Sequence, residues 1–207
     1  RVVYGSQQKD GGEIRVNGKP VRILHPADAV RCGIGLLTEN RKEEGLFPEM
    51  TCEDNIALPS LKRFRIGKGC PLLSYRRIYA ESKALSEKLS TKMRSLSSKV
   101  KHLSGGNQQK IIVSRWLMKS LDVLVFIEPT RGVDVGAKTE IYRILESLAQ
   151  QGKAIIVIST DTTEILQLSD RIFVMVDGRI HAELQEQTDE ETLARLIQGK
   201  PEKKVIA

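Results

Sequence analysis

Two short segments carry the residues with the clearest chemistry, and the first is residues 103–110. Here Ser104, Gly105 and Gly106 come directly before a stretch of helix-forming composition. A helix that begins in this way leaves several backbone N–H groups and the positive end of its dipole open, and such an end binds anions, usually phosphate. Ser-Gly-Gly is also an ordinary helix cap, so this segment alone leaves both interpretations open.

The second segment follows an apolar run at residues 123–127, after which come Glu128 and, a little further on, Asp134. Carboxylates at the carboxyl end of a parallel strand point into the crevice where α/β sheets bind ligands. Glu128 is therefore placed to orient an attacking water, and Asp134 to reach across a loop. The alternative, a strand end followed by an acidic N-cap of the next helix, stays open for either residue alone.

The apolar pattern predicts the elements that position these segments. Five consecutive apolar residues at 123–127 indicate a strand buried on both faces of a parallel sheet, and residues 154–158 form a second all-apolar strand. Apolar residues recur at helical spacing in residues 108–118 and 138–150, which predicts two helices. Strands and helices that alternate in this way favour a parallel sheet with right-handed crossovers.

Weaker patterns predict the remaining elements. Asn17-Gly18 supplies the positive backbone angles of a tight turn within a hairpin, and Pro26 opens a short helix that closes at Gly33. The other expected elements are a strand at 34–37, helices at 76–96 and 164–168, and hairpins at 13–23 and 172–184.

Length and composition narrow the class of protein. A chain of 207 residues suffices for one α/β domain with a sizeable core. No apolar run approaches the ~20 residues of a membrane span. No signal peptide is expected, although the abrupt start at Arg1 suggests that an earlier part is absent. Cys32, Cys52 and Cys70 lack the spacing of a disulfide framework or a zinc site, which favours thiols in a reducing cytoplasm.

Positive charge is concentrated in residues 60–101. This region holds twelve Lys and Arg against only Glu81 and Glu87, a local net charge of +10, whereas the whole chain carries +7. Such a region fits a nucleic acid, an anionic membrane surface or a solvated helix face. Its three aromatic residues are too few for a platform on which bases stack.

Taken together, the motifs resemble the ATPase subunits of ABC transporters, and within them the branch that imports monosaccharides such as ribose, xylose and galactose. Leu-Ser-Gly-Gly-Asn-Gln-Gln-Lys at 103–110 is followed, after one helix and one apolar strand, by Glu-Pro-Thr-Arg-Gly-Val-Asp-Val-Gly-Ala-Lys at 128–138. The resemblance covers nearly the whole chain, including the segments 11–21, 38–46, 55–56, 169–172 and 177–180. Such subunits carry two ATPase halves in one polypeptide, and this chain is similar to the second.

The resemblance implies an α/β fold, a P-loop NTPase-like ABC ATPase domain with a parallel sheet core, an antiparallel β portion and a helical subdomain. Residues 1–59 would be the N-terminal part of the ATPase core, through a Q-loop-like segment, and 60–101 the basic helical subdomain. Residues 102–190 would hold the signature segment, the Walker B-like strand, the D-loop and a closing hairpin. Residues 191–207 would be a C-terminal tail.

The resemblance also implies roles for individual residues. Glu128 takes the place of the catalytic glutamate that polarises water, and Asp134 that of the D-loop aspartate that communicates between two sites. Glu39 takes the place of the Q-loop glutamine, which contacts Mg²⁺ and the membrane subunit. Four further residues would form the signature segment, which presses on the γ-phosphate of an ATP held by the opposite half. These residues are Ser104, Gly105, Gly106 and Gln108.

The sequence departs from the family pattern in three places. It contains no Gly-x-x-x-x-Gly-Lys-Ser/Thr, and the family's P-loop would lie before Arg1. Ile127 stands where an aspartate normally supports Mg²⁺, and Thr160 replaces a histidine that second halves often lack. We therefore expect this half not to hydrolyse ATP at its own site, the isolated chain to be inactive, and ATP and Mg²⁺ to be bound largely through the partner half.

The expected partners are ABC permease subunits, the partner ATPase half and, indirectly, a periplasmic or extracellular sugar-binding protein. The basic residues 60–101 would dock on the permease close to lipid head groups, which places the protein peripherally at the cytoplasmic face of the membrane without nucleic acid. Two alternatives stay open. One is a nucleic-acid-associated ABC ATPase, and the other a non-catalytic remnant or interaction module. The sequence does not identify the transported solute.

Overall fold

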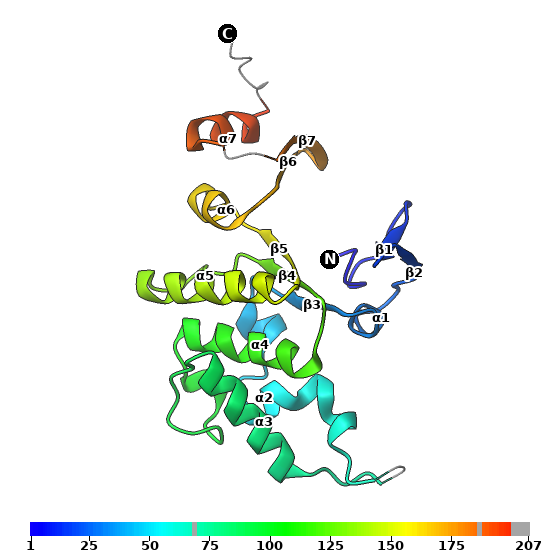
Figure 1. The fold of residues 1–207 in the computed structure, drawn as a ribbon, viewed down its shortest axis with the longest axis vertical. Coiled ribbons are helices and arrows are strands. Elements are labelled where there is room, and N and C mark those ends of the chain that lie inside the picture. The colour runs from blue at the N-terminus through cyan, green and yellow to red at the C-terminus, as the bar shows by residue number, and fades with distance from the viewer. Residues whose placement is uncertain (68–69, 186–187, 200–207) are drawn as a thin grey trace. The chain divides into compact units, whose positions relative to one another are not determined.

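The computed structural model describes residues 1–67, 70–185 and 188–199. The chain divides into two compact units at Ile156 and Val157, and Figure 1 labels the elements of each. Within the described ranges, every helix is too short or too polar to cross a bilayer. The four-part division expected from the sequence stays a prediction, and Lys68 of its basic region lies outside the described residues.

A three-stranded sheet has the order β3 (Ile34–Leu37), β4 (Val123–Ile127) and β5 (Ala154–Ile158), and the boundary of the first unit falls within β5. β3 and β4 are parallel, with Ile34 opposite Val123. The structure confirms all three predicted strands. The middle of β4 is buried, as expected, whereas its two end residues are only half-buried and β5 exposes every second residue.

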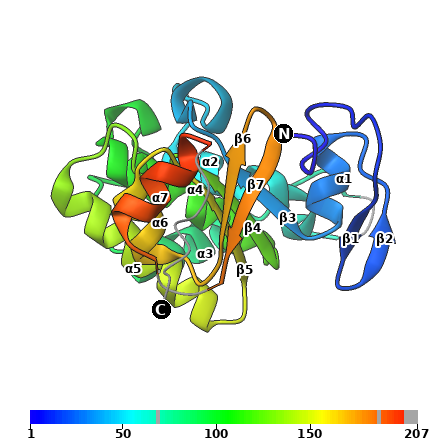
Figure 2. The same ribbon diagram turned by 90° about the horizontal axis from the view of Figure 1, so that it is seen from above.

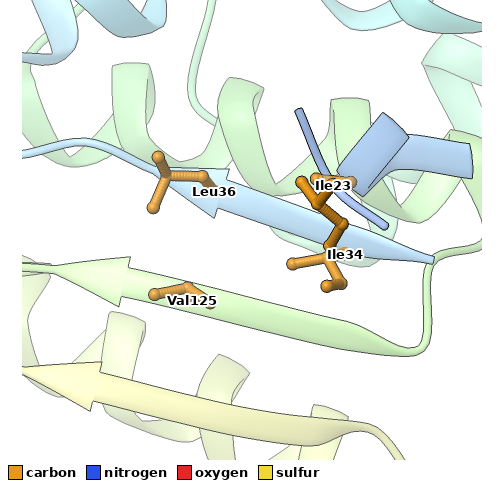
Figure 3. Close-up of a cluster of buried hydrophobic side chains, with 5 residues drawn as sticks. Ile23, Ile34, Leu36 and Val125 are labelled. Carbon is orange, nitrogen blue, oxygen red and sulfur yellow. The ribbon is translucent and has the colours of Figure 1, made fainter. Parts of the chain in front are cut away.

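One hydrophobic cluster joins this sheet to the N-terminal hairpin, β1 (Ile14–Val16) and β2 (Lys19–Val21), and to helix α1 (Pro26–Arg31). The predicted Asn-Gly turn is confirmed, because Asn17 and Gly18 have φ of 51° and 73°. Figure 3 shows four of the buried side chains of this cluster, two from β3, one from β4 and one from the segment before α1: Ile34, Leu36, Val125 and Ile23. Apolar burial of this kind contributes about 25 cal/mol for each Å² removed from water.

Helix α4 (Gly105–Lys119) is the central helix of the first unit. On one side it packs against α2 (Cys52–Ala57) and α3 (Tyr75–Lys88), and on the other it reaches β3 and α5 (Val135–Gln150) (Figure 1). Two short 3₁₀ turns, η2 (Leu58–Phe64) and η3 (Val100–His102), connect the smaller helices. Trp116 anchors α4 to the sheet through its indole N–H, which donates to the Leu36 carbonyl at 3.0 Å.

Several helix boundaries differ from the sequence-based expectation. The helix predicted to run to residue 96 ends at Lys88, because Ser90 adopts a left-handed backbone angle of 48°. α5 begins before residue 138, because Asp134 caps it by accepting a hydrogen bond from the Ala137 N–H at 3.0 Å. Helix α2 was not predicted. It is six residues long and is capped by Thr51, and six residues are too few for a clear apolar period.

The second unit contains α6 (Thr162–Leu168), the antiparallel strands β6 (Ile172–Val176) and β7 (Arg179–Leu184), and α7 (Glu190–Ile197). The predicted hairpin is thereby confirmed. α6 packs beside α7 (Figure 2), and Val174, Leu193 and Leu196 form a small core. Part of the expected C-terminal tail is therefore the helix α7, while residues 200–207 lie outside the described residues.

Candidate functional site

The start of α4 is held in place by its own side chains. We call residues 104–108 the signature turn. The exposed Ser104 precedes the helix, and its hydroxyl accepts a hydrogen bond from the Asn107 side-chain amide at 2.8 Å. Asn107 in turn accepts one from the Lys92 N–H at 2.7 Å. The hydroxyl is thus oriented by Asn107 rather than used to cap the helix, and Ser104 is exposed at the helix start.

Neighbouring residues come so close to the two glycines of the signature turn that a side chain would not fit. A Cβ added to Gly105 would lie 2.5 Å from an Arg41 guanidinium nitrogen and 2.9 Å from the Gly132 carbonyl oxygen. A Cβ added to Gly106 would lie 2.8 Å from the Cβ of Ala137 at the start of α5. The signature turn therefore packs directly against residues 128–134, which we call the strand-end loop. The two motifs singled out in the sequence form one site.

Gln108 points into the protein instead of outward. It is 4% exposed, and its amide donates to the Val100 carbonyl at 3.3 Å. Its carbonyl oxygen accepts a hydrogen bond from Nε of Arg41, also at 3.3 Å. In this arrangement Gln108 supports the signature turn from inside the protein. A direct contact of Gln108 with nucleotide stays a prediction.

Arg41 is the residue of this site that the sequence analysis did not single out. It lies at the start of η1 (Arg41–Gly45), a short π-helical turn after β3, and it is half-buried. Its two terminal nitrogens donate to the carbonyls of Arg131 at 2.8 Å and Gly132 at 3.3 Å. Burial lowers the pKa of the guanidinium below its usual value, but arginine stays cationic at neutral pH. The only sequence signal was its place in the Glu-Asn-Arg-Lys loop.

Glu39 reaches the strand-end loop as well, through an ion pair with Arg131. Both residues follow neighbouring parallel strands, whose carboxyl ends meet at one edge of the sheet. The structure thus brings the Q-loop-like residue next to the second motif. Its carboxylate is engaged by an arginine, however, and contact with Mg²⁺ or a membrane subunit stays a prediction.

Glu128 and Asp134 lie at opposite ends of the strand-end loop. Glu128 is half-buried at the end of β4 with φ of 49°, a left-handed conformation that costs a non-glycine residue roughly 1–2 kcal/mol. Strain of this kind is concentrated at functional positions. Asp134 is the N-cap of α5, so the structural alternative considered for this residue does occur. The catalytic and communicating roles of the two carboxylates stay predictions.

The expectation that the strand end lacks a Mg²⁺ site of its own stays a prediction. The half-buried Ile127 packs against the cluster around Ile34 and offers no oxygen ligand. Of the neighbouring carboxylates, Glu39 is paired with Arg131. Across the described residues, no group of three or more His, Cys, Asp or Glu side chains could hold a metal ion. What the site does present is a helix start with an exposed Ser104 and with Arg41 beside it, a combination suited to an anion.

Known proteins resemble this chain over most of its length. The profile of the family described as "ABC transporter" matches residues 1–131. A putative ribose/galactose/methyl galactoside import ATP-binding protein of Albidiferax ferrireducens is 50% identical over 89% of this chain and 36% of its own length. A protein of the same description from Geobacillus kaustophilus is 45% identical over 95% of this chain and 39% of its own length. The ribose import ATP-binding protein RbsA of Yersinia pestis is 44% identical over 89% and 36%.

Solved structures show the same fold. A nucleotide-free ATP-binding cassette from an ABC transporter matches with a TM-score of 0.75 and 22% identity, over 97% of this chain and 78% of that one. A dimeric ATP-binding cassette in a post-hydrolysis state, bound to ADP and Pi, matches with a TM-score of 0.72 and 20% identity, over 88% and 77%. The predicted fold class, an ABC ATPase domain with a parallel core and antiparallel and helical parts, is thereby confirmed.

Proposed function

This chain belongs to the ABC transporter family, and we propose that it is part of the ATP-binding subunit of an importer for a simple sugar of the ribose or galactose type. The proposal is supported by the relatives at 44–50% identity, whose names specify import of these sugars. The chain spans 36–39% of the length of those relatives. The activity we propose is therefore that of the larger subunit, which couples ATP hydrolysis to uptake.

Within that subunit, the signature turn would complete an ATP site whose other side is formed by an opposing ATPase half. The observation that carries this proposal is the start of α4, where Ser104 is exposed and Gly105 and Gly106 admit close neighbours. Open N–H groups, the helix dipole and the nearby Arg41 cation all favour the negative γ-phosphate. Mg²⁺ would come with the nucleotide held by the opposing half.

We further propose that this half does not hydrolyse ATP at its own strand end. Ile127 replaces the oxygen ligand expected there, and Glu39 is engaged by Arg131. Glu128 would then keep the place of a catalytic glutamate without acting as one. The alternative is a wholly non-catalytic interaction module. It differs from this proposal in one respect only: its signature turn would not affect ATP turnover in the partner's site.

The decisive experiment replaces Ser104 by arginine in the full-length subunit, assembled with its permease and sugar-binding protein in liposomes. We expect ATP turnover and sugar uptake to fall by about 100-fold, because a large cation at the helix start blocks the γ-phosphate and one lost transition-state contact costs about that much. Ser147→Arg, at an exposed serine of α5 outside the basic region, is the matched control and should keep normal rates. Unchanged turnover in Ser104→Arg would contradict the proposal.

A second substitution, Glu128→Gln, tests the claim about this half's own site. The change removes the carboxylate but keeps its size. We expect turnover of the assembled importer to change by less than about twofold, since the water would be activated in the opposing half. A loss of the size seen in Ser104→Arg would instead show that this strand end is catalytic.

We also propose that the basic region meets the permease at the cytoplasmic face of the membrane. The arginines and lysines that the structure describes between residues 62 and 77 are exposed, for example Lys62, Arg76 and Arg77. The test is binding of the subunit to its permease and to duplex DNA or RNA as salt is raised. Binding to the permease supports the proposal, and tight nucleic-acid binding with a steep salt dependence favours the nucleic-acid alternative.

A further inference from the structure

We propose that Arg41 is the positioning residue that fastens the signature turn to the strand-end loop and so fixes how the open helix start is presented to ATP. The inference rests on the proposed function of the signature turn and assigns a part of the site that neither motif contains. Arg41 belongs to neither segment, yet it contacts both.

The first argument is that the planar guanidinium of Arg41 uses all of its nitrogens as donors. Its three nitrogens donate to three different acceptors: the Gln108 side chain at 3.3 Å, the Arg131 carbonyl at 2.8 Å and the Gly132 carbonyl at 3.3 Å. The planar fork of arginine can hold two loops at a fixed separation in this way. A lysine ammonium, which is a compact point charge on a flexible stem, cannot reproduce the geometry.

The second argument is the close approach to Gly105. A Cβ at this position would lie 2.5 Å from the Arg41 guanidinium, a separation that side-chain atoms do not reach. The arginine therefore lies directly over the glycine, and the Gly132 carbonyl oxygen, 2.9 Å from the same point, is the rigid neighbour that requires a glycine here. This packing also sets a positive charge beside the N-terminus of α4, where it adds to the potential of the helix dipole.

The third argument is that the loop carrying Arg41 is anchored on both sides. Before Arg41, Glu39 forms an ion pair with Arg131 of the strand-end loop. After it, the Gly45 carbonyl accepts a hydrogen bond from Arg115 in the middle of α4 at 2.6 Å. A displacement of residues 39–45 would therefore move the guanidinium and loosen the signature turn. Arg41 is placed to transmit the position of this loop to the ATP contact.

The kinetic test compares Arg41→Met and Arg41→Lys in the full-length subunit, assembled with its permease and binding protein. We expect kcat for ATP to fall by about tenfold or more in both variants, because small displacements of a contact group are costly. KM for ATP should change by less than about threefold, because the opposing half holds the nucleotide. Arg22→Met, at an exposed arginine after β2, is the control and should match the unaltered subunit.

Hydrogen exchange supplies a readout that does not depend on ATP. In Arg41→Met, the amides of residues 105–108 and 131–133 should exchange faster, while those of the β6–β7 hairpin should not change. Faster exchange throughout the first unit would show a merely structural role and overturn the inference. The Gln108→Leu variant should lower kcat as well, and the double variant should be no worse than Arg41→Met alone.

The outcomes separate this inference from the proposed function. Normal kcat in Arg41→Met, with turnover abolished in Ser104→Arg, would overturn the role of Arg41 and leave the signature turn in place. Normal kcat in Arg41→Lys would show that charge suffices and would equally overturn a positioning role based on shape. Normal turnover in Arg41→Met and Ser104→Arg together would overturn the proposed function itself.

Discussion

Two arginines make hydrogen-bond networks at helix α4, and the two networks differ in how deeply they are buried. Arg115, in the middle of the helix, is 7% exposed and donates to the Asn55 carbonyl at 2.7 Å, the Gly45 carbonyl at 2.6 Å and the Asn55 side chain at 3.1 Å. Arg41, at the start of the helix, also has three acceptors but is only half-buried. Burial lowers the pKa of Arg115 to about 10, and it also lowers that of Arg41.

The difference indicates which arginine supports the fold and which serves the site. Two of the three acceptors of Arg115 belong to Asn55, which is fully buried and hydrogen-bonded to Phe47 and Thr51. Buried polar groups that lose a partner cost free energy because water cannot replace it. Two of the acceptors of Arg41 are carbonyls of the exposed residues Arg131 and Gly132, and the third is the side chain of the buried Gln108. Loss of Arg115 should thus affect folding, and loss of Arg41 should affect activity.

The largest expected effect on stability comes from Arg115→Met. We expect the free energy of unfolding to fall by about 2–4 kcal/mol, because the carbonyls of Gly45 and Asn55 lose a charged donor in a dry environment. Arg41→Met should lower it by less than about 1 kcal/mol. Urea unfolding of the full-length subunit, followed by a probe in this domain, measures both. An equal loss of unfolding free energy in the two variants would contradict the distinction between Arg115 and Arg41.

Gly106→Ala should have the next largest effect. Its new Cβ would lie 2.8 Å from the Cβ of Ala137, so α4 and α5 must separate slightly, at about 1–3 kcal/mol. Gly136→Ala is a matched control in the first turn of α5, where the nearest atom, an Asp134 oxygen, is 3.5 Å away. It should stabilise the protein by up to about 1 kcal/mol through helix propensity. A neutral Gly106→Ala would show that the turn is not tightly packed.

The C-terminal end of α4 is not part of the candidate site, and it can be compared with the start of the helix. Ser120 ends the helix with φ of 57°, a conformation that glycine adopts without strain. We expect Ser120→Gly to raise the free energy of unfolding by about 0.5 kcal/mol, since relief of the strain outweighs the greater freedom of the unfolded chain. Lys119→Gly, one residue earlier and still helical, should lower it by about 0.5–1 kcal/mol. Thermal unfolding of the two variants would distinguish them.

The smallest effect concerns the third polar contact of α4. The buried Lys110 donates to Glu140 at 2.7 Å and to the Ser90 carbonyl at 3.0 Å, and the hydrogen bond and charge of Lys110 lower the pKa of Glu140. A carboxyl whose pKa is lowered by folding stabilises the protein above its unfolded pKa, and this contribution is lost as pH falls through the folded value. Unfolding should therefore become less pH-dependent below about pH 4.5 in Glu140→Gln. An unaltered pH dependence would contradict the contact.

Local chemistry determined much of what the sequence could predict. Asn17-Gly18 predicted its turn, apolar runs predicted β3, β4 and β5, and the motif residues predicted a family that the comparisons confirm. Helix ends were less accurate, because Ser90 and Asp134 act through backbone geometry and capping that residue type only suggests. The short helix α2 gave no period long enough to detect.

The arrangement of the site was decided by tertiary structure alone. Arg41 and Gln108 are 67 positions apart, and Arg41 and Arg131 are 90 apart, so no local spacing connects them. They meet because β3 and β4 are parallel neighbours whose carboxyl ends emerge at the same edge, beside the start of α4. The sequence determined which groups could bind a phosphate. The packing of strands and helix decided which arginine would hold them together.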